Sequence, residues 1–579
     1  MKRSSLSIFD QFQKIIYRAG FFFQVTLTYI HTLRYLTFIQ IAYRIWYYFY
    51  SVKVSESAHF DINEKNHDWV PSAKRARSML GDGEFIFYGK IGKLEEIGWD
   101  GEGQDKLWRY LQNYFDDLNA VSAKKRGRWH TNLMKKWVLQ NPPAEGVGWE
   151  PYPTSIRIVN WVKWSLQGND LPTECQESLF IQARYLRKRL EWHLMGNHVF
   201  ANAKALLFAG LYFECSEAKS WFDFGLRVIN QQLEEQVLPD GAHFELSPSY
   251  QILFIEDLLD LLNVSQVFGG AVDKSTTSRW RNKTCEMILW LKEMLHDDGE
   301  ISYFNDSHLG INPPVRELLH YARRMGLYSE KTKKFSEKQS VKELGWARLT
   351  YLNSSGYVRL KTKVATAILD CAEIGASYQP GHAHADTLSF ELSLFGRRVF
   401  VNCGTSTYNN NATRHAERAT QSHTTLEFNH KSSSEVWSAF RVARRAFPSK
   451  VSIENKGKAL EVSCFHDGYA RLFRPARHQR IWSLEKNKLR VTDNLYADHK
   501  QFVVRYHLHP ELTLKKVSHN SFEVTFGSQC LALIKITKGV AKIDASHYAP
   551  TFGSRSLTVC LAVYPQEFNG VEVEISWDD

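Results

Sequence analysis

Four short segments concentrate reactive side chains beside residues that interrupt regular structure. The first is Gly196-Asn197-His198, an amide and an imidazole inside an apolar stretch. Burying such a pair costs free energy unless it is hydrogen-bonded, so it is either a satisfied core feature or functional. The second is a polar loop that ends at Tyr250, where Ser247 or Ser249 can cap a helix and place Tyr250 in its first turn. A buried hydroxyl bonded to backbone is the structural alternative for this tyrosine.

The other two segments lie in the second half of the chain. His382, His384 and Asp386 alternate, so in an extended chain their side chains point the same way. This pattern indicates a metal site or a proton-transfer site, with a chance surface cluster as the alternative. The fourth segment, residues 414–445, is rich in arginines that can clamp carboxylates or sulfates through two hydrogen bonds. A solvated charged face is the alternative there.

Several common catalytic signatures are missing. The chain has no G-x-x-x-x-G-K-[ST] phosphate loop, no G-x-S-x-G elbow and no H-E-x-x-H zinc motif. Its eight cysteines are scattered and form no C-x-x-C pair, so neither a zinc knuckle nor a dithiol redox site is indicated. Scattered thiols are typical of a reducing compartment.

Composition limits the class of protein and its partners. Hydrophobic residues make up 44% and charged residues 23% of 579 residues, which predicts a globular chain of several domains. Lysine and arginine number 73 against 62 acidic residues, a formal net charge of +11. Such a charge attracts nucleic acid, acidic polysaccharide or anionic lipid. The basic residues are dispersed without a nucleic-acid-binding module, so we expect no nucleic-acid partner.

The hydrophobic period divides the chain into two parts. From about residue 105 to 330 the apolar residues recur at helical spacing, and we predict eight to ten helices without strands between them. The stretch 179–213 is one such apolar run, broken at Gly196-Asn197. From about residue 345 the period becomes two, as in 388–394 and 557–563, which predicts half-buried strands of an antiparallel sandwich. Two separately cored domains, first α and then β, place a cleft at their junction.

The N-terminal region is aromatic and basic. Residues 20–50 are rich in Phe, Tyr, Ile and Trp, but charged residues such as Arg34 and Arg44 leave no run long enough for a membrane-spanning helix. Two interpretations remain: a helical arm packed on the body, or an amphipathic surface in peripheral contact with a membrane. No signal peptide is recognised, so we expect the protein in the bacterial cytoplasm or associated with the membrane.

Four strings, taken together and in order, resemble the heparinase II/III-like polysaccharide lyases. They are residues 107–110 (LWRY), residues 148–161 (GWEPYPTSIRIVNW), the Tyr250 segment and the His382 segment. The resemblance runs from about residue 100 to 445 and is strongest to members encoded with exopolysaccharide or capsule machinery. It implies a multidomain fold: an N-terminal arm and irregular segment (1–100), an incomplete (α/α) toroid (101–345) and an antiparallel β-sandwich (346–579).

The resemblance also implies β-elimination next to a uronate carboxylate. Asn197, with His198 adjacent, matches the group that neutralises the carboxylate. Tyr250 matches the acid, which in syn elimination also serves as base, and we expect a nearby Arg or His⁺ to lower its pKa. His382 matches a base that approaches from the other face.

A larger set of residues is expected to contact the polymer by stacking and by anion pairing. These residues are Trp149, Tyr152, Arg157, Trp161, His243, Glu245, Arg418, Arg441 and Arg444. Glu245 and Asp386 are also the two carboxyls that hydrolysis, the rival reaction, would need.

The resemblance further implies one divalent metal, Zn or Ca, held by the sandwich loops. His384 and His423 match the two histidine ligands, and Asn402 stands at the position of the aspartate. A neutral amide is a weaker ligand than a carboxylate.

The sequence therefore predicts a lyase that cleaves a uronate-containing acidic polysaccharide. A bacterial exopolysaccharide ranks first, and heparan-like and alginate-like polymers stay open. The alternative is a non-catalytic polysaccharide-binding or assembly factor of a surface-polymer pathway, which the missing signal peptide and Asn402 favour.

Overall fold

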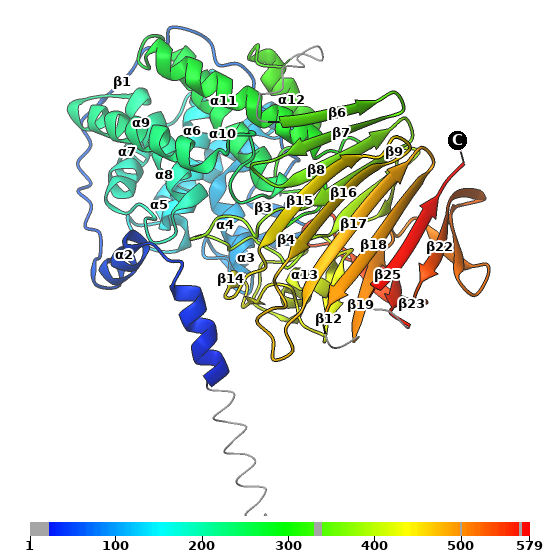
Figure 1. The fold of residues 1–579 in the computed structure, drawn as a ribbon. Coiled ribbons are helices and arrows are strands. Elements are labelled where there is room, and N and C mark those ends of the chain that lie inside the picture. Colours follow the sequence, from blue (N-terminus) through cyan, green and yellow to red (C-terminus); the bar gives the residue numbers. More distant parts are fainter. Residues whose placement is uncertain (1–22, 329–338, 498–500, 567–569, 579) are drawn as a thin grey trace, which may run out of the picture.

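The computed structural model describes residues 23–328, 339–497, 501–566 and 570–578. A helical toroid is followed by an antiparallel sheet domain, which confirms the predicted fold class (Figure 1). The first 22 residues of the predicted N-terminal arm lie outside the described residues.

Helix α2 (Phe38–Phe49) belongs to the N-terminal arm. The remaining helices of the first part form the incomplete toroid: α3 (Leu94–Ile97), α4 (Lys106–Tyr114), α5 (Gly127–Gln140), α6 (Pro151–Leu166), α7 (Thr173–Lys188), α8 (Gly196–Tyr212), α9 (Ser216–Gln236), α10 (Pro248–Val267), α11 (Lys274–Glu293) and α12 (Val315–Arg324). Helix α8 is central and packs against α6, α7, α9 and α10. Its side chains are buried almost all round, because neighbouring helices cover each of its faces.

Two local differences from the predicted helices matter. The apolar run 179–213 is two helices, and Gly196 starts the second, so Asn197 and His198 occupy a first turn and not a helix middle. Gly196 has φ +54°, which favours glycine, and a Cβ there would lie 1.8 Å from Gln379 Oε1, so a larger residue would displace the Gln379 side chain. A short strand, β5 (Phe213–Glu214), also pairs with β1 (Asp61–Ile62) inside the region predicted to lack strands.

The second part consists mainly of three antiparallel sheets. The six-stranded sheet contains β6 (Gln339–Leu344), β7 (Ala347–Leu352), β8 (Tyr357–Thr362), β9 (Ala365–Asp370), β10 (Phe390–Leu394) and β11 (Arg397–Phe400). The eight-stranded sheet contains β15 (Pro448–Asn455), β16 (Leu460–His466), β17 (Arg477–Glu485), β18 (Lys488–Tyr496), β20 (Thr513–Lys516), β21 (Ser521–Phe526), β22 (Gln529–Lys538) and β25 (Gly570–Ser576). The four-stranded sheet contains β12 (Leu426–Phe428), β19 (Phe502–His507), β23 (Val540–Tyr548) and β24 (Ser556–Tyr564).

Smaller sheets complete the fold. A three-stranded sheet of β2 (Met79–Gly81), β3 (Glu84–Phe87) and β4 (Lys90–Lys93) precedes the toroid helices, and β13 (Val436–Trp437) pairs with β14 (Arg441–Val442).

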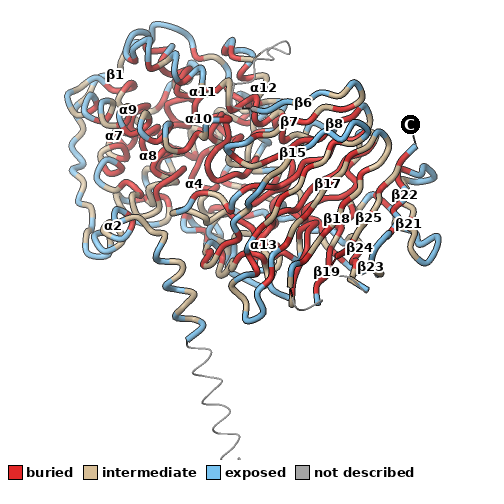
Figure 2. The backbone as a smooth tube through the Cα atoms, in the orientation of Figure 1, coloured by how far each residue is buried: buried red, intermediate tan, exposed pale blue. Residues whose placement is uncertain are grey.

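Strand β10 is buried on both faces, although its alternating pattern predicted a half-buried strand. Its apolar residues face the sandwich core. Its polar residues meet the helical side, where Glu391 Oε2 lies 2.8 Å from His296 Nε2 and Ser393 Oγ lies 2.7 Å from His296 Nδ1. The toroid thus covers the polar face of this sheet, and buried backbone runs continuously from the helices into the inner strands (Figure 2).

The N-terminal arm, residues 23–49, contacts both parts of the molecule. Thr37 and Gln40 form a capping box that starts α2. Gln40 Nε2 donates to the carbonyls of Leu194 and Tyr378, at 3.2 and 3.3 Å. In the described part of the chain, no helix is both long and apolar enough to cross a bilayer.

Candidate active site

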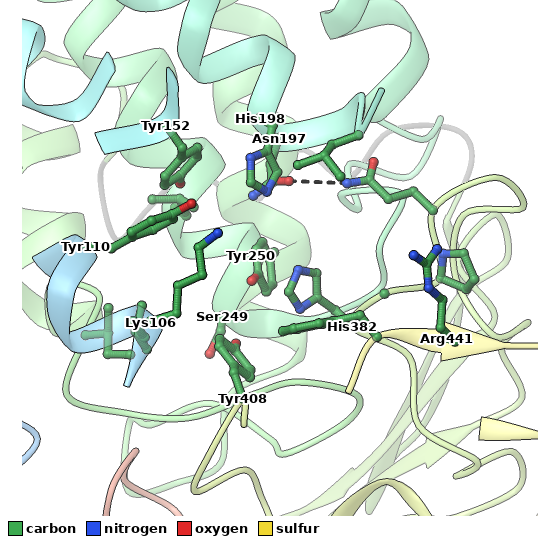
Figure 3. Close-up of a pocket in the computed structure, with 18 of the residues that line it drawn as sticks. Lys106, Tyr110, Tyr152, Asn197, His198, Ser249, Tyr250, His382, Tyr408 and Arg441 are labelled. Carbon is green, nitrogen blue, oxygen red and sulfur yellow. Dashed lines mark hydrogen bonds between the residues drawn. The ribbon is translucent and has the colours of Figure 1, made fainter. Parts of the chain in front are cut away.

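A cavity of about 560 Å³ opens where the toroid meets the sheet domain (Figure 3). Its walls come from the N-terminal arm, from toroid helices including α4, α6, α8 and α10, and from loops of the sheet domain. Several of the predicted site residues line it: Tyr152, Asn197, His198, Tyr250, His382 and Arg441.

Tyr250 and His382 are in direct contact in this cavity. The Ser247 side chain caps α10 and accepts from the backbone N–H of Tyr250, which fixes the tyrosine in the first turn as predicted. His382 lies in the loop between β9 and β10. The ring centroids are 4.1 Å apart, so a sugar cannot lie between the rings. The predicted approach from opposite faces is therefore wrong, and both groups reach a ligand from the same side.

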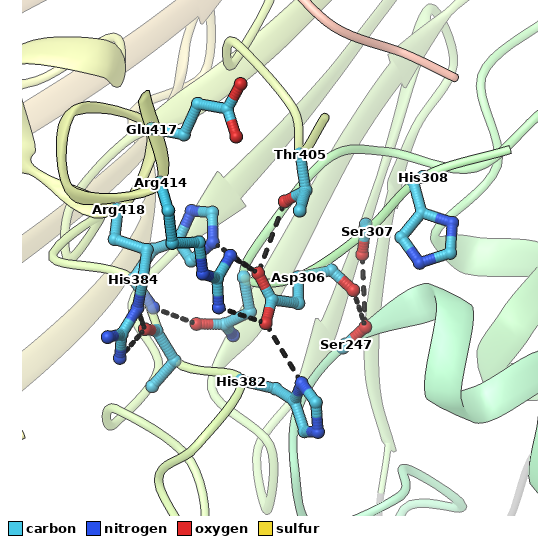
Figure 4. Close-up of polar contacts among 12 residues, drawn as sticks. Ser247, Asp306, Ser307, His308, His382, His384, Thr405, Arg414, Glu417 and Arg418 are labelled. Atoms are coloured by element: carbon cyan, nitrogen blue, oxygen red, sulfur yellow. Dashed lines mark hydrogen bonds and ion pairs between the residues drawn. The ribbon is translucent and has the colours of Figure 1, made fainter. Parts of the chain in front are cut away.

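Asp306 fixes the proton state of His382 (Figure 4). Although burial favours a protonated carboxyl, Arg414 and the His382 and His384 rings hold the pKa of Asp306 well below its usual value. An ionised carboxylate only accepts, so His382 donates from Nδ1 to Asp306 Oδ2, at 2.9 Å. This tautomer leaves the lone pair on Nε2. Burial lowers the pKa of His382, which makes the ring a neutral base at neutral pH.

Tyr250 is held in its protonated form. Burial, followed by the nearby Tyr408, Glu245 and Asp306 side chains, raises the pKa of Tyr250 well above its usual value. The expected lowering by an Arg or His⁺ is wrong, because the ring that touches the phenol is a neutral imidazole. Tyr250 is therefore suited to donate a proton.

Asn197 lies in the first turn of α8, at the edge of the same cavity. Gln379 Nε2 donates to Asn197 Oδ1 at 3.5 Å, which leaves the amide N–H₂ group to meet an anion. The first-turn N–H groups of a helix also favour negative charge. His198 follows, with Nδ1 3.1 Å from Glu191 Oε2 and its ring 4.7 Å from that of Tyr152.

Comparison with known proteins agrees with this architecture. The heparinase II/III N-terminus model matches residues 41–333, and the heparinase II/III-like C-terminal model matches residues 347–577. The chain belongs to the heparinase II/III family.

Relatives of this family member are distant. A heparin-sulfate lyase of Pedobacter heparinus is 25% identical over 58% of this chain and 52% of its own length. A heparin-sulfate lyase of Bacteroides stercoris is 25% identical over 41% of this chain and 36% of its own length. The chain thus spans about half or less of the curated relatives it matches.

Solved structures share the fold at low sequence identity. A heparinase III structure aligns with a TM-score of 0.64 and 16% identity, covering 80% of this chain and 76% of its own. A chondroitin AC lyase of Streptomyces coelicolor aligns with a TM-score of 0.50 and 9% identity, covering 82% and 75%.

Two site residues of this heparinase II/III family member were not predicted from the sequence. Asp306 lies between α11 and α12 in the run Asn305-Asp306-Ser307-His308, within a loop rich in polar residues, so nothing in the sequence distinguishes it. Tyr408 lines the cavity and is hydrogen-bonded to Tyr250, and its Oη lies 3.2 Å from His308 Nε2. The polar run 404–411 that carries Tyr408 has no spacing that indicates chemistry.

Three residues expected to line the cleft are core residues. Trp149 and Trp161 are buried in the helical core. Arg157 is also buried, where it donates to the carbonyl of Gly148 at 2.9 Å and stacks over Trp137. These side chains cannot contact a sugar in this structure. Tyr152, from the same helix α6, does line the cavity.

Like Arg157, two of the other three predicted anion-binding arginines are used within the protein. Arg418 is buried and donates to the carbonyl of Ala383 at 2.9 and 3.0 Å. Arg444 pairs with Glu435. Both lie outside the cavity lining, which corrects their expected role, whereas Arg441 lies in it.

His243 and Glu245 are also buried outside the lining. His243 Nε2 lies 3.1 Å from Gln236 Oε1. Glu245 Oε2 lies 3.8 Å from His382 Nε2, and burial, reinforced by the Asp306 charge, raises the pKa of Glu245 to about 8. Asp386 is likewise buried and accepts from the backbone N–H of Asn305. The two carboxyls that hydrolysis would need therefore do not face the cavity.

The predicted metal ligands come only partly together. The rings of His384 and His423 are 5.2 Å apart, and burial lowers their pKa values to about 4 and about 3. His384 Nδ1 and both nitrogens of His423 are buried without a hydrogen-bond partner among the described residues. The Asn402 amide, however, accepts from the Thr424 N–H at 3.3 Å. Within the described ranges no three His, Cys, Asp or Glu side chains form a metal-holding group, so this donor set fits a divalent ion poorly and the metal stays a prediction.

Proposed function

We propose that this chain is a polysaccharide lyase that cleaves a uronate-containing acidic polysaccharide by β-elimination. The observation that carries the proposal is the contact between a protonated phenol and a neutral imidazole, supplied by the two domains, in one cavity with Asn197. Elimination next to a carboxylate needs a base, an acid and a group that neutralises the carboxylate. The cavity offers one candidate for each role.

Each of these residues has a separate role in the elimination. Asn197 and the first turn of α8 bind the carboxylate, which makes the proton on the neighbouring carbon removable. His382 Nε2 takes that proton, the electron pair forms the carbon–carbon double bond, and the bond to the leaving sugar oxygen breaks. Tyr250 donates its proton to that oxygen. Asp306 stabilises the imidazolium that forms, and exchange with water after product release takes the proton from His382 and returns one to the Tyr250 phenolate.

The charge of the cavity favours an anionic polymer. Its lining includes the cations Arg44, Arg75, Lys106, Arg441 and Arg445. Among the lining residues that the structure describes, the carboxylate is that of Asp116, 3.6 Å from Arg75 Nε. A cationic cleft raises the local concentration of an acidic substrate and speeds its association.

Within acidic polysaccharides we propose a bacterial exopolysaccharide as the substrate. The proposal rests on the sequence resemblance to members encoded with exopolysaccharide machinery. Two curated relatives are named heparin-sulfate lyases, which makes heparan sulfate the second polymer to test.

The test is the near-ultraviolet absorbance of unsaturated uronate ends, followed on exopolysaccharides, heparan sulfate and alginate. The proposal expects absorbance to rise with at least one polymer and to fall by orders of magnitude in Tyr250→Phe. A non-catalytic binding or assembly factor is the alternative that the Asn402 position favours. Such a protein would bind a polymer equally well with tyrosine or phenylalanine at position 250, and would release no unsaturated ends. That result would overturn the lyase proposal.

We further propose that the arm makes peripheral contact with an anionic membrane on the cytoplasmic side. The described arm exposes large apolar side chains: Phe38, Ile41, Ile45, Trp46, Tyr48 and Phe49. Exposed aromatic and aliphatic groups of this kind insert into the headgroup region of a bilayer. Flotation with phosphatidylglycerol vesicles tests the contact. Binding that is lost in a Phe38→Ser, Trp46→Ser variant supports it, and no binding by the wild type rejects it.

A further inference from the structure

The N-terminal arm forms one wall of the active-site cavity. Thr32, Tyr35, Gln40 and Arg44 are among the residues that line it. The wall is held from the sheet domain, where Trp437 Nε1 donates to Thr32 Oγ1 at 3.1 Å and the Arg445 guanidinium lies 3.6 Å over the Tyr35 ring. On the other side, Gln40 joins the wall to the toroid by donating a hydrogen bond to the carbonyl of Leu194. The arm is therefore an integral part of the site.

Arg44 brings an uncompensated cation into this wall. Its Nη2 lies 3.5 Å from the carbonyl of His193, at the limit of a hydrogen bond. Its Nε is buried without a hydrogen-bond partner in the described structure. Arg441, at the start of β14, is half-buried in the same lining. Both guanidinium groups line the cavity, and burial, followed by the charge of Arg441, lowers the pKa of Arg44, so the two cations repel each other.

We propose that Arg44 and Arg441 together bind an oxyanion, carboxylate or sulfate, on the sugar next to the one that undergoes elimination. An anion between the two groups would relieve their repulsion and satisfy the open guanidinium donors. The place follows from two hydrogen bonds: Gln40 donates to the carbonyl of Tyr378, and the next residue, Gln379, donates to Asn197. The arm wall is thus adjacent to the carboxylate site at Asn197. This inference rests on the proposed function for the identity of the ligand.

The test measures binding without turnover. In a Tyr250→Phe background, calorimetry with heparan sulfate oligosaccharides and with unsulfated uronate oligosaccharides gives Kd for Arg44→Gln, Arg441→Gln and Arg44→Lys. Each glutamine variant should weaken binding about tenfold, the usual loss for one charged contact. Arg44→Lys should retain most of the affinity. Arg34→Gln is the matched control, because Arg34 is an exposed arginine of the same arm outside the lining.

Three outcomes overturn the subsite: unchanged affinity in Arg44→Gln, an equal loss in Arg34→Gln, or no binding of either oligosaccharide. A larger penalty on one of the two oligosaccharides tells which oxyanion the pair binds. Circular dichroism and the Tm of each variant separate lost contacts from lost folding, with Arg44→Lys as the second check. Wild-type cleavage is assayed in parallel. Binding that depends on Arg44 without unsaturated products keeps the subsite and rejects the lyase.

Discussion

His382 Nδ1 lies 2.9 Å from Asp306 Oδ2, and this contact joins a loop of the sheet domain to a loop of the toroid. The same carboxylate accepts from His384 Nε2 at 2.8 Å and pairs with Arg414. Asp306 therefore sets the tautomer of the base and also holds the two halves of the site together. Its charge is available to stabilise the imidazolium that forms during turnover.

Replacing Asp306 should lower kcat much more than it lowers the affinity for the substrate. In Asp306→Asn the amide can present N–H to the imidazole, which disfavours the tautomer with a free Nε2, and we expect kcat to fall by about two to four orders of magnitude. Asp493→Asn is the matched control, since Asp493 is a buried carboxylate that accepts from His478 and Arg480 in the sheet domain, outside the cavity lining. Comparable kcat losses in the two variants, at matched folded fraction, would contradict the assignment.

The pH profile follows from the two shifted pKa values. A base must be deprotonated, so kcat/KM should fall as the pH drops through the pKa of His382, which burial places below its usual value of about 6.5. The acid must be protonated, and the raised pKa of Tyr250 should keep the alkaline limb above about pH 10. A falling limb between neutrality and pH 9 in the wild type would instead favour a tyrosine of lowered pKa.

A leaving group that needs no proton isolates the role of Tyr250. With polymeric substrate, Tyr250→Phe should lose about three orders of magnitude in rate, the usual contribution of a general acid. A synthetic uronide with a nitrophenolate leaving group should recover most of that rate, because nitrophenolate departs unprotonated. His382→Ala should be slow with both substrates. Equal losses of Tyr250→Phe on both substrates would assign the phenol to proton abstraction.

The ring contact also predicts stereochemical preference. Because Tyr250 and His382 reach the sugar from one side, the proton and the leaving oxygen should depart from the same face. Among oligosaccharides that differ only at the carbon bearing the carboxylate, the epimer with a syn arrangement should be cleaved and the anti epimer should persist. Equal rates for both epimers would show that acid and base act from two sides.

The Asn402 position can be tested by restoring a carboxylate. Asn402→Asp places a carboxylate at the position of the predicted ligand, near two unprotonated imidazoles, and bound zinc after dialysis should rise to about one ion per chain. Wild-type protein should hold well below that amount. One zinc per wild-type chain, measured by plasma mass spectrometry, would show that the amide suffices as a ligand.

Much of the architecture could be predicted because local pattern determines it. The change from helical to alternating period near residue 345 marks the order of the two parts. The helix that carries Tyr250 starts at Pro248 because Ser247 caps it and proline is accommodated in a first turn. These signals lie within a few residues of the features they determine.

The remainder of the site depends on contacts that no local pattern encodes. Asp306 meets His382 across 76 positions of the chain. In α6, Tyr152 faces the cavity, whereas Arg157 and Trp161 face the core. This helix is buried on nearly all sides, so its hydrophobic pattern does not indicate which residues face the cavity. Arg44 lines the site because the arm folds back over the cleft, and only the tertiary structure shows this arrangement.

Cleavage in oxygen-labelled water tests the central claim most directly. Elimination breaks the bond to the leaving sugar without adding water, so mass spectrometry should find unsaturated fragments that carry no heavy oxygen at the cleaved bond. Saturated fragments with one heavy oxygen per cleavage would mean hydrolysis, and would contradict the roles given to Tyr250, His382 and Asn197.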